Sequence, residues 1–398
     1  MRFFYKAVVA ALILLTACSC GKKPESPSVS DQSVSDQLAS AQSASEKSAP
    51  AKESSAVSVK AVDMIGREVE VPRHPQRIIT DRILPFPSTY FTATHSSMKE
   101  VVAMHPASKS AAVNSMLNIL APAVSNAAAN LYTGNQPNIE DVMALNPDLV
   151  FAYADEAGLI DPYIKAGITA LGVRAASAAG GDALETLRGW FSVLAYTGGD
   201  ETEMRAIIEE GETVKQRISA ALAGYSKPKP RAVFIFSTSG GNLEIAGGNF
   251  FSEYWLKHTG ADDPASQDFK GRKVVNMEQL YAWDPDILYI TNFTSLMPEE
   301  VYANAIDGQD WSSLKAVRER RVYKIPLGIY RWFPPSGDAP LMFKWLAQKN
   351  HPELFIYSME AEIKDYYQRH YGYALSDEEV SFILNPEAAA AAGYKTSY

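Results

Sequence analysis

The feature that most constrains this chain is an internal repeat of fourteen residues. The segment NIEDVMALNPDLVF at 138–151 recurs as NMEQLYAWDPDILY at 276–289, with five identical positions. Each copy is typical of a short helix, a Pro-Asp turn and a buried strand, because Asn caps helices and an apolar run without polar alternation suits a parallel strand covered on both faces. Two copies 138 residues apart predict two similar α/β lobes, with chance likeness as the alternative.

Further apolar runs predict the rest of both lobes. Residues 77–80 are expected to open the first sheet, residues 232–236 the second, and residues 322–325 to add a late strand. Between the lobes, apolar residues recur at helical spacing over residues 200–222, and a continuous helix of that length would form a rod of roughly 33 Å. Gly211 lies inside this stretch and costs a helix about 1 kcal/mol relative to Ala, which argues against its continuity.

The chain begins with the pattern of an exported protein. Arg2 and Lys6 are followed by an apolar run over residues 7–15, which has signal-peptide length and is too short to span a bilayer. The run ends in Leu-Thr-Ala-Cys at Cys18, which resembles the lipobox of bacterial lipoproteins. The resemblance implies a signal peptide over residues 1–17 and lipidation of Cys18, which would anchor the chain to a cell-envelope membrane on its periplasmic or extracellular side. The alternative is an ordinary signal peptide with incidental cysteines.

The residues that follow divide into a tether and a globular body. Residues 18–58 are rich in Ser, Ala, Gln, Lys and Glu and contain no aromatic residue, so they cannot bury enough surface to offset their ordering entropy. From Val59 onward the composition is globular, and some 340 residues exceed what one core usually covers. Cys18 and Cys20 are the two cysteines of the chain, so no disulfide, thiolate metal site or cysteine nucleophile is expected in the body.

Several landmarks, taken as a set, resemble the periplasmic binding proteins for iron–siderophores, haem and cobalamin, the lipoprotein type with a helical backbone. The segment VDMIGREVEVP at 62–72 is similar to the start of that family, and the two repeat copies are similar to its next landmarks. WSSLKAV at 311–317 is similar to its late segment, and residues 334–355 to its C-terminal helices. The landmarks occur in family order over residues 62–375.

This resemblance implies an α/β fold of two Rossmann-like lobes joined by a single long backbone helix, with the ligand cleft between them. The lobes would span residues 59–199 and 225–398, and the helix residues 200–224. It also implies a substrate-binding lipoprotein of an ABC importer, which delivers its cargo to a permease and ATPase complex; we expect a monomer. In that family the glutamates at the places of Glu140 and Glu278 meet permease arginines, so these two are the docking candidates. The alternative is a solvated carboxylate at a helix start.

The ligand is expected in loops that follow the strands, because open α/β sheets bind ligands at the carboxyl ends of their strands. Aromatic side chains offer flat contact area, and arginines suit the clustered oxygens of a metal chelate. The ligand-binding candidates are Arg82, Tyr90, Tyr132, Tyr153, Ser239, Tyr330, Arg331 and Trp332. Loop residues with the same expectation are Pro87, Ser88, Thr238, Gly240, Gly241, Asn292 and Phe293. The alternative for each is a structural role.

The expected cargo is a metal chelate, with an iron(III)-siderophore first and cobalamin or haem as alternatives. The metal would arrive as part of the chelate, so neither a cofactor nor a protein metal site is expected. Six histidines show no pair at metal-ligand spacing, which argues against a direct zinc or manganese receptor, although His95 or His105 could complete the coordination of a bound chelate.

Other function classes are disfavoured by what the sequence lacks. The net charge is −9 and no basic stripe occurs, which argues against nucleic acid. No nucleophile elbow, HExxH, Walker loop or GxGxxG occurs, so we do not expect an enzyme. An anchored sensor or adhesin that uses the same clamp stays open as an alternative. Residues 376–398 carry no interpretable pattern.

Overall fold

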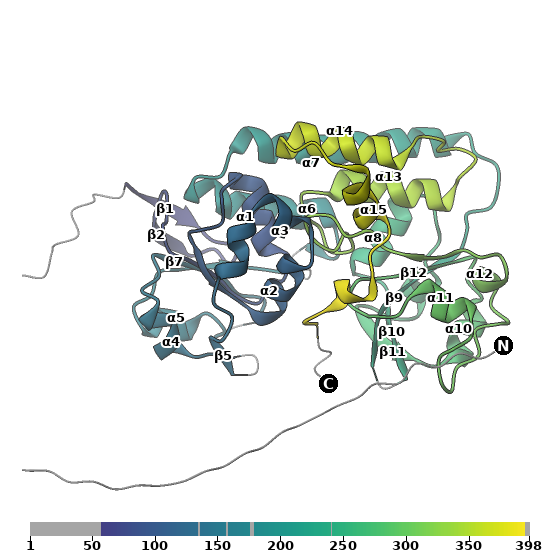
Figure 1. Ribbon diagram of the computed structural model, residues 1–398, viewed down its shortest axis with the longest axis horizontal. Coiled ribbons are helices and arrows are strands. Elements are labelled where there is room, and N and C mark those ends of the chain that lie inside the picture. The colour runs from purple at the N-terminus through teal and green to yellow at the C-terminus, as the bar shows by residue number, and fades with distance from the viewer. Residues whose placement is uncertain (1–56, 134–135, 157, 176–178, 240, 395–398) are drawn as a thin grey trace, which may run out of the picture. The chain divides into compact units, whose positions relative to one another are not determined.

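The computed structural model describes residues 57–133, 136–156, 158–175, 179–239 and 241–394, which fold into two α/β lobes (Figure 1). The predicted signal peptide, the lipidation cysteine and nearly all of the tether lie outside these residues. None of the helices within the described residues has the length and apolar composition that a membrane span requires.

The first lobe is built on a four-stranded parallel sheet with the strand order β4-β3-β7-β8. Its strands are β3 (Ile78–Thr80), β4 (Val101–Met104), β7 (Leu149–Tyr153) and β8 (Ala170–Val173). Two antiparallel pairs accompany it, namely β1 (Ser58–Val62) with β2 (Glu68–Pro72) and β5 (Tyr132–Thr133) with β6 (Gln136–Pro137). Its helices are α1 (Phe86–Thr94), α2 (Pro106–Val113), α3 (Met116–Leu120), α4 (Ile139–Ala144), α5 (Asp161–Lys165) and α6 (Ala183–Leu194). Two short 3-10 helices are η1 (Pro122–Asn126) and η3 (Ala195–Thr197).

The second lobe is built on a five-stranded mixed sheet with the strand order β11-β10-β9-β12-β13, in which β9, β12 and β13 run parallel. Its strands are β9 (Ala232–Ser239), β10 (Asn242–Ala246), β11 (Arg272–Val275), β12 (Ile287–Ile290) and β13 (Val322–Lys324). Its shorter helices are α8 (Phe251–His258), α9 (Pro264–Asp268), α10 (Met277–Trp283), α11 (Pro298–Tyr302) and α12 (Lys315–Arg318). The C-terminal helices are α13 (Ala339–Asn350), α14 (Met359–Tyr371), α15 (Asp377–Leu384) and the 3-10 helix η4 (Ala388–Ala391).

Burial on both faces explains why the central strands are apolar without alternation. In β7, Leu149 and Phe151 belong to one hydrophobic cluster, whereas Val150 and Ala152 belong to another on the opposite face. Strand β12 repeats this pattern, because alternate residues enter the cluster shared with β7 and a separate cluster on the outer face. Successive side chains of a strand point to opposite faces, so helices cover both sides of each sheet.

The two repeat copies have the same surroundings, as the sequence predicts. In the first lobe, Asp148 accepts a hydrogen bond from the backbone N–H of Arg77 at 3.0 Å, and its own N–H donates to the Arg77 carbonyl at 2.8 Å. In the second lobe, Asp286 and Arg231 make the same two bonds at 2.7 and 2.8 Å. The Pro-Asp turn of each copy therefore fixes the start of its neighbouring strand, β3 or β9.

A single helix, α7 (Glu201–Ala223), connects the two lobes without interruption. Asp200 caps it through hydrogen bonds from the N–H groups of Thr202 and Glu203. Gly211 does not break the helix, and its place is explained by packing: a Cβ there would lie 2.8 Å from Leu184 Cδ2 on α6. The missing side chain thus lets α6 and α7 approach closely, which outweighs the weak helix propensity of glycine.

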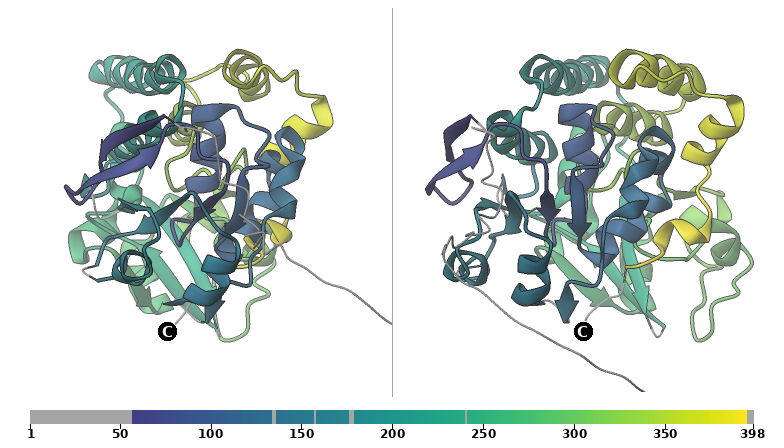
Figure 2. Two further views of the ribbon diagram at one scale, coloured as in Figure 1. Left: turned by 90° about the vertical axis from the view of Figure 1, so that its left-hand side faces the viewer. Right: turned by 60° about the vertical axis from the view of Figure 1, so that its left-hand side comes forward.

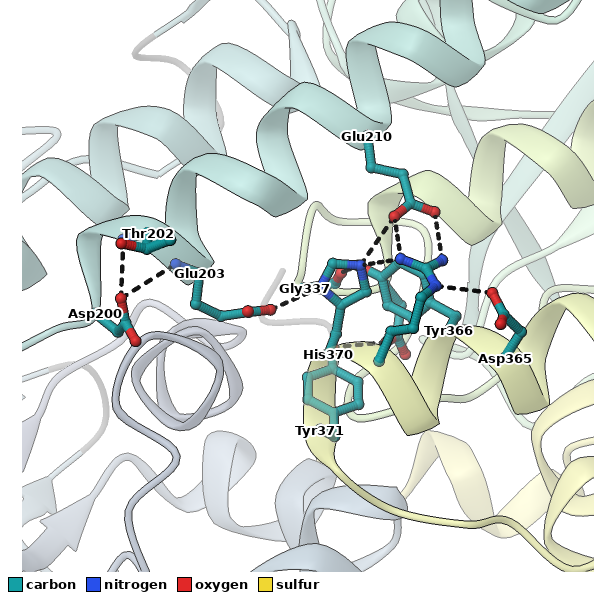
Figure 3. Close-up of polar contacts among 11 residues, drawn as sticks. Asp200, Thr202, Glu203, Glu210, Gly337, Asp365, Tyr366, His370 and Tyr371 are labelled. Atoms are coloured by element: carbon teal, nitrogen blue, oxygen red, sulfur yellow. Dashed lines mark hydrogen bonds and ion pairs between the residues drawn. The ribbon is translucent and has the colours of Figure 1, made fainter.

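Helix α14 lies alongside α7 (Figures 1 and 2). Charged side chains join the two helices. His370 Nδ1 lies 2.6 Å from Glu203 Oε1, and its Nε2 lies 2.9 Å from Glu210 Oε2 (Figure 3). Arg369 donates to both oxygens of Glu210 at 2.7 and 3.0 Å. Burial opposes the charge of His370, but the hydrogen bonds to the two carboxylates outweigh it and raise the pKa of the imidazole. We call this group of four residues the α7–α14 clasp.

Candidate functional site

A cavity of about 270 Å³ lies between the two lobes. From the first lobe it is lined by Arg82, Ile83, Leu84, Pro85, Ala175 and Trp190. From the second it is lined by Phe236, Phe250, Phe251, Arg272, Phe293, Tyr330, Phe333, Pro334 and Tyr394. Many of these residues follow the carboxyl ends of β3, β8, β12 and β13, which is where a ligand site is expected in open α/β sheets. We refer to this space as the interlobe cavity.

A larger hollow of about 610 Å³ lies elsewhere, on the second lobe. Its walls come from α11, β13, α13, the start of α14 and residues 384–387, so no first-lobe residue among those described contributes to it. Because the family resemblance implies a ligand cleft between the lobes, the smaller interlobe cavity is the candidate site.

Aromatic rings form most of the second-lobe wall of the interlobe cavity. Phe236 and Phe293 are stacked, with ring centroids 4.7 Å apart and an interplanar angle of 19°. Phe333 packs across Phe236 at 5.8 Å. On the first lobe, Trp190 is held by a hydrogen bond from its Nε1 to the carbonyl of Arg174 at 2.6 Å. Such rings present a rigid apolar surface that loses little conformational entropy when a ligand binds.

Two arginines line the cavity, one from each lobe. The guanidinium of Arg82 lies over the ring of Tyr153 at 4.8 Å, and its buried Nε has no hydrogen-bond partner among the described residues. The guanidinium of Arg272 lies over Phe236 at 4.5 Å and is 3.4 Å from a carboxylate oxygen of Glu244. Arg82 therefore has an unused donor next to the cavity, whereas Arg272 forms an ion pair with Glu244 and keeps part of its side chain exposed.

Arg331 lies behind the cavity wall rather than in it. Its side chain is 0% exposed and packs on the ring of Phe293 at 4.7 Å. Its Nε and Nη2 donate to the carbonyl of Ala390 at 3.2 and 3.0 Å, and Nη2 also donates to the carbonyl of Ala392 at 3.1 Å. Its Nη1 has no hydrogen-bond partner and no carboxylate forms an ion pair with it within the described ranges. Burying a guanidinium without a counter-ion costs free energy, because its positive charge is not balanced. This unbalanced charge would therefore favour binding of an anion nearby.

Of the other sequence-predicted ligand residues, Tyr330 lines the cavity and Tyr153 touches it only through Arg82. Tyr90 lies on α1 and is buried in the hydrophobic core of the first lobe. Its hydroxyl donates to Glu100 at 2.9 Å, and it does not line the cavity. Tyr132 packs beside Asp81, and burial together with that carboxylate raises the pKa of its phenol. The structure thus brings Arg82, Tyr153 and Tyr330 to one place and leaves Tyr90 and Tyr132 outside it.

Trp332 takes part in a buried junction instead of the cavity wall. Its Nε1 donates to Asp338 at 2.9 Å, and Tyr367 and Tyr371 donate to the same carboxylate at 3.0 and 2.9 Å. Asp338 is 0% exposed, and this burial raises the pKa of its carboxyl despite the donors. Ser239 ends β9, and the placement of its side chain lies outside the described structure.

The two histidines considered for chelate coordination lie in different settings. His105 caps α2 by accepting from the N–H of Ala107 at 3.3 Å, and burial together with Arg82 lowers the pKa of its imidazole to about 4. His95 ends α1 and packs near Phe91. Within the residues that the structure describes, no group of three His, Cys, Asp or Glu side chains is placed to hold a metal ion.

The docking candidates occupy matching positions in the two lobes. Glu140 is the second residue of α4 and Glu278 the second residue of α10, and each follows an asparagine whose side chain caps the helix. Both glutamates are exposed. They are therefore placed on equivalent surfaces, as the repeat predicts.

Arg272 and Tyr394 are two of the cavity residues that the sequence did not predict, and both carry polar groups. Arg272 begins β11, so a search of residues after the carboxyl ends of strands passes over it. Tyr394 comes from the C-terminal segment, which has no motif, and only the three-dimensional path of the chain brings it to the cavity. Trp190 was missed for a related reason, because it belongs to the amphipathic face of α6 and is typical of a core residue.

Comparison with known proteins identifies this two-lobed arrangement. The family model of the periplasmic binding proteins matches residues 93–327. The chain belongs to this family. It is accordingly a solute-binding protein of an ABC transporter, which works with a permease and an ATPase and is not an enzyme.

Individual relatives agree with this assignment. The molybdate-binding protein MolA of Haemophilus influenzae is 23% identical over 328 residues, which cover 78% of this chain and 90% of that protein. The Fe(3+)-citrate-binding protein YfmC of Bacillus subtilis is 25% identical over 197 residues, 48% of this chain and 57% of that protein. The crystal structure of a periplasmic solute-binding protein from Veillonella parvula is 28% identical with a TM-score of 0.72 and covers 83% of this chain and 97% of that one.

Proposed function

We propose that the protein captures a negatively charged metal chelate, with an iron(III)-siderophore as the first candidate, and delivers it to the permease. The observation that carries this proposal is the interlobe cavity, where Arg82 and Arg272 from opposite lobes stand among aromatic rings. Guanidinium groups bind clustered chelate oxygens through paired hydrogen bonds, and the rings cover the apolar backbone of the chelator. The unbalanced charge of buried Arg331 also favours an anionic cargo.

A small oxyanion is the second candidate. The volume of about 270 Å³ falls below the roughly 300–1,000 Å³ of pockets that enclose drug-sized ligands. A tetrahedral oxyanion or a compact iron–carboxylate complex would fit such a space without lobe opening. The names of the Haemophilus and Bacillus relatives, which mention molybdate and Fe(3+)-citrate, support cargo of this kind. Cobalamin and haem belong to the same importer class and would require the lobes to separate further.

The same proposal covers docking and anchoring. Exposed carboxylates at Glu140 and Glu278 suit a partner with two arginines, because paired charges fix the orientation of an encounter more than they add affinity. The sequence pattern at Cys18 supports a lipid anchor that would keep the receptor near its permease. An anchored sensor or adhesin would need neither glutamate for its function, so an import assay separates the two interpretations.

Tryptophan fluorescence is the direct test of the cargo, because Trp190 lines the cavity. The full chain would be titrated with ferric citrate, ferric hydroxamate and catecholate siderophores, molybdate, haem and cobalamin. We expect saturable binding of at least one anionic iron chelate. Binding of molybdate alone would select the second candidate, and binding of cobalamin without any anion would contradict the proposed charge recognition.

A further inference from the structure

The last described residues, 387–394, lie between the two lobes, and we call them the C-terminal strap (Figure 1, yellow). The strap follows α15, whose Ile383 carbonyl accepts a hydrogen bond from the N–H of Leu327 at 2.8 Å. At its far end, Gly393 has a φ of +77° and lies so close to α2 of the first lobe that an added Cβ would clash with Ser110. The strap therefore contacts both lobes.

The backbone of the strap satisfies the buried cation of the second lobe. The carbonyls of Ala390 and Ala392 receive the hydrogen bonds that Nε and Nη2 of Arg331 donate. Carbonyl oxygens are neutral, so they satisfy the donors without supplying the negative charge that a buried guanidinium favours. A chelate or oxyanion could offer the same oxygen geometry together with a full countercharge.

The tip of the strap places a phenol in the ring-lined site. The ring of Tyr394 packs on Phe293 at 4.8 Å and on Phe236 at 5.9 Å, in both cases edge to face. Its hydroxyl oxygen accepts a hydrogen bond from Arg272 Nη1 at 3.0 Å. An oxygen-bearing ring held between phenylalanines and an arginine is what a phenolate or catecholate group of a chelate would present to the same residues.

The strap has few anchors besides these contacts. Residues 388–392 are five consecutive alanines, whose methyl groups carry no polar atom and little apolar area. Its described backbone hydrogen bonds are short-range, such as Ala390 N–H to the Glu387 carbonyl at 3.0 Å and Ala392 N–H to the Ala389 carbonyl at 2.9 Å. A segment tied down mainly by one arginine on carbonyls and one tyrosine ring can be displaced by a ligand that replaces those contacts.

We propose that the C-terminal strap is an internal ligand mimic, which occupies the second-lobe half of the cargo site and is displaced when an anionic chelate binds. This inference rests on the proposed function, since it assigns Arg272, Phe293 and Arg331 to cargo once the strap has left. Strap and cargo compete for the same residues, so the affinity measured for the full chain is lower than that of the site itself.

The occlusion itself is tested without any cargo. Phenylglyoxal modification followed by peptide mass mapping would compare the full chain with a variant that ends at Pro386. We expect Arg331 and Arg272 to react faster in the shortened chain, with Arg188, whose side chain is 51% exposed, reacting equally in both. Equal reactivity of Arg331 in the two chains would overturn the proposal.

The competition is tested by binding of ferric citrate and a ferric catecholate. If the strap-free form makes up about a tenth of the full chain, removing the strap tightens binding roughly tenfold. Tyr394→Phe, which loses only the contact to Arg272, should fall between the two, and Glu378→Gln on exposed α15 should match the unmodified chain. Weaker binding by the shortened chain would mean that the strap is a wall for the ligand, and this would overturn the mimic.

Amide hydrogen exchange distinguishes a strap that the ligand displaces from a strap that closes over the ligand, because the exchange rate changes in opposite directions. Added chelate should speed amide exchange of residues 388–394 if it displaces the strap, and should slow exchange if the strap closes over the ligand. Failure of every chelate and oxyanion to bind either chain would instead refute the proposed function, while the arginine reactivities would still decide whether the strap occludes the site.

Discussion

Single buried side chains decide how the walls of this site are held. Asp338 accepts from the rings of Trp332, Tyr367 and Tyr371 and from the backbone N–H of Ile329, so it joins the loop after β13 to α14. Next to it, Gly328 has no room for a side chain, because an added Cβ would clash with an oxygen of this carboxylate. The loop that leads into the cavity wall is therefore positioned by one carboxylate.

Replacing this carboxylate should destabilise the fold strongly. Asp338→Ala leaves four buried donors without an acceptor, and we expect a loss of about 3–5 kcal/mol in the free energy of unfolding. Urea denaturation followed by circular dichroism measures it. Asp365→Asn on the exposed face of α14 is the matched control and should change stability by less than ~1 kcal/mol. A loss of that small size for Asp338→Ala would show that the junction is not structural.

The unpaired donor of Arg82 predicts an effect on binding with little effect on folding. Arg82→Gln removes the cavity cation of the first lobe, and we expect the affinity for an anionic iron chelate to fall about tenfold or more. Arg82→Lys keeps the charge but loses the planar fork, so it should rescue only part of the loss. Arg188→Gln, on the exposed surface of α6, is the control for a simple change in net charge. Unaltered affinity in Arg82→Gln would remove this residue from the site.

The sequence predicted which residues line the cavity only where their position is set by the strand that directly precedes them. Arg82 and Tyr330 follow β3 and β13 closely, so the rule of strand ends places them correctly at the cavity. Arg331 and Trp332 follow the same strand as Tyr330, but their partners in space, Ala390 and Asp338, turn them inward. Those partners lie on segments whose path depends on packing of the whole chain, which no local pattern encodes.

At the scale of elements, the α7–α14 clasp ties the connecting helix to the second lobe through charge. His370 adds stability while it is protonated between Glu203 and Glu210. Because its folded pKa is raised above the ordinary 6.5, this contribution is fully present below about pH 6.5 and is lost as the pH rises through the raised value. Burial opposes ionisation of Glu210, but His370 and Arg369 outweigh it and lower its pKa from 4.5 to about 2, so its contribution is lost only in stronger acid.

The clasp therefore predicts a pH-dependent stability difference. His370→Gln should lower the free energy of unfolding by about 1–3 kcal/mol near pH 5.5, and the difference should shrink as the pH rises above neutrality. Urea midpoints from pH 5 to pH 9 measure it. His74→Gln, at an exposed histidine in the first lobe, should follow the unmodified protein throughout. A difference that grows with pH would contradict the charge assignment of His370.

Elements were predictable where one repeated pattern encodes them. The two repeat copies, the apolar strands beside them and the long helix α7 all follow from local periodicity. The continuity of α7 through Gly211 does not, because its cause is the Leu184 side chain of another helix. The sequence did not predict the C-terminal strap either. Its alanines form no recognisable pattern, and its position depends on Arg331, which lies much earlier in the sequence.

At the scale of the whole molecule, the repeat places the two docking candidates at equivalent positions in the two lobes. Each lobe presents one exposed glutamate at the second position of an equivalent helix, so the two charges are separated by the arrangement of the lobes themselves. The interlobe cavity is built at the ends of other strands, β3, β8, β12 and β13. The proposed docking and cargo sites therefore use different residues of one framework.

Charge reversal should separate these two functions. In the double variant Glu140→Lys and Glu278→Lys, we expect cargo affinity to stay unchanged, because neither residue lines the interlobe cavity. Import by cells that carry the matching permease should fall to background, since two lysines would then face the arginines proposed for the partner. The matched control is the double variant Asp141→Lys and Glu319→Lys, which reverses two other exposed carboxylates, one in each lobe, and should leave import intact. Loss of affinity in the first variant would place its glutamates in the binding site instead, and unchanged import would support a receptor that acts without this form of docking.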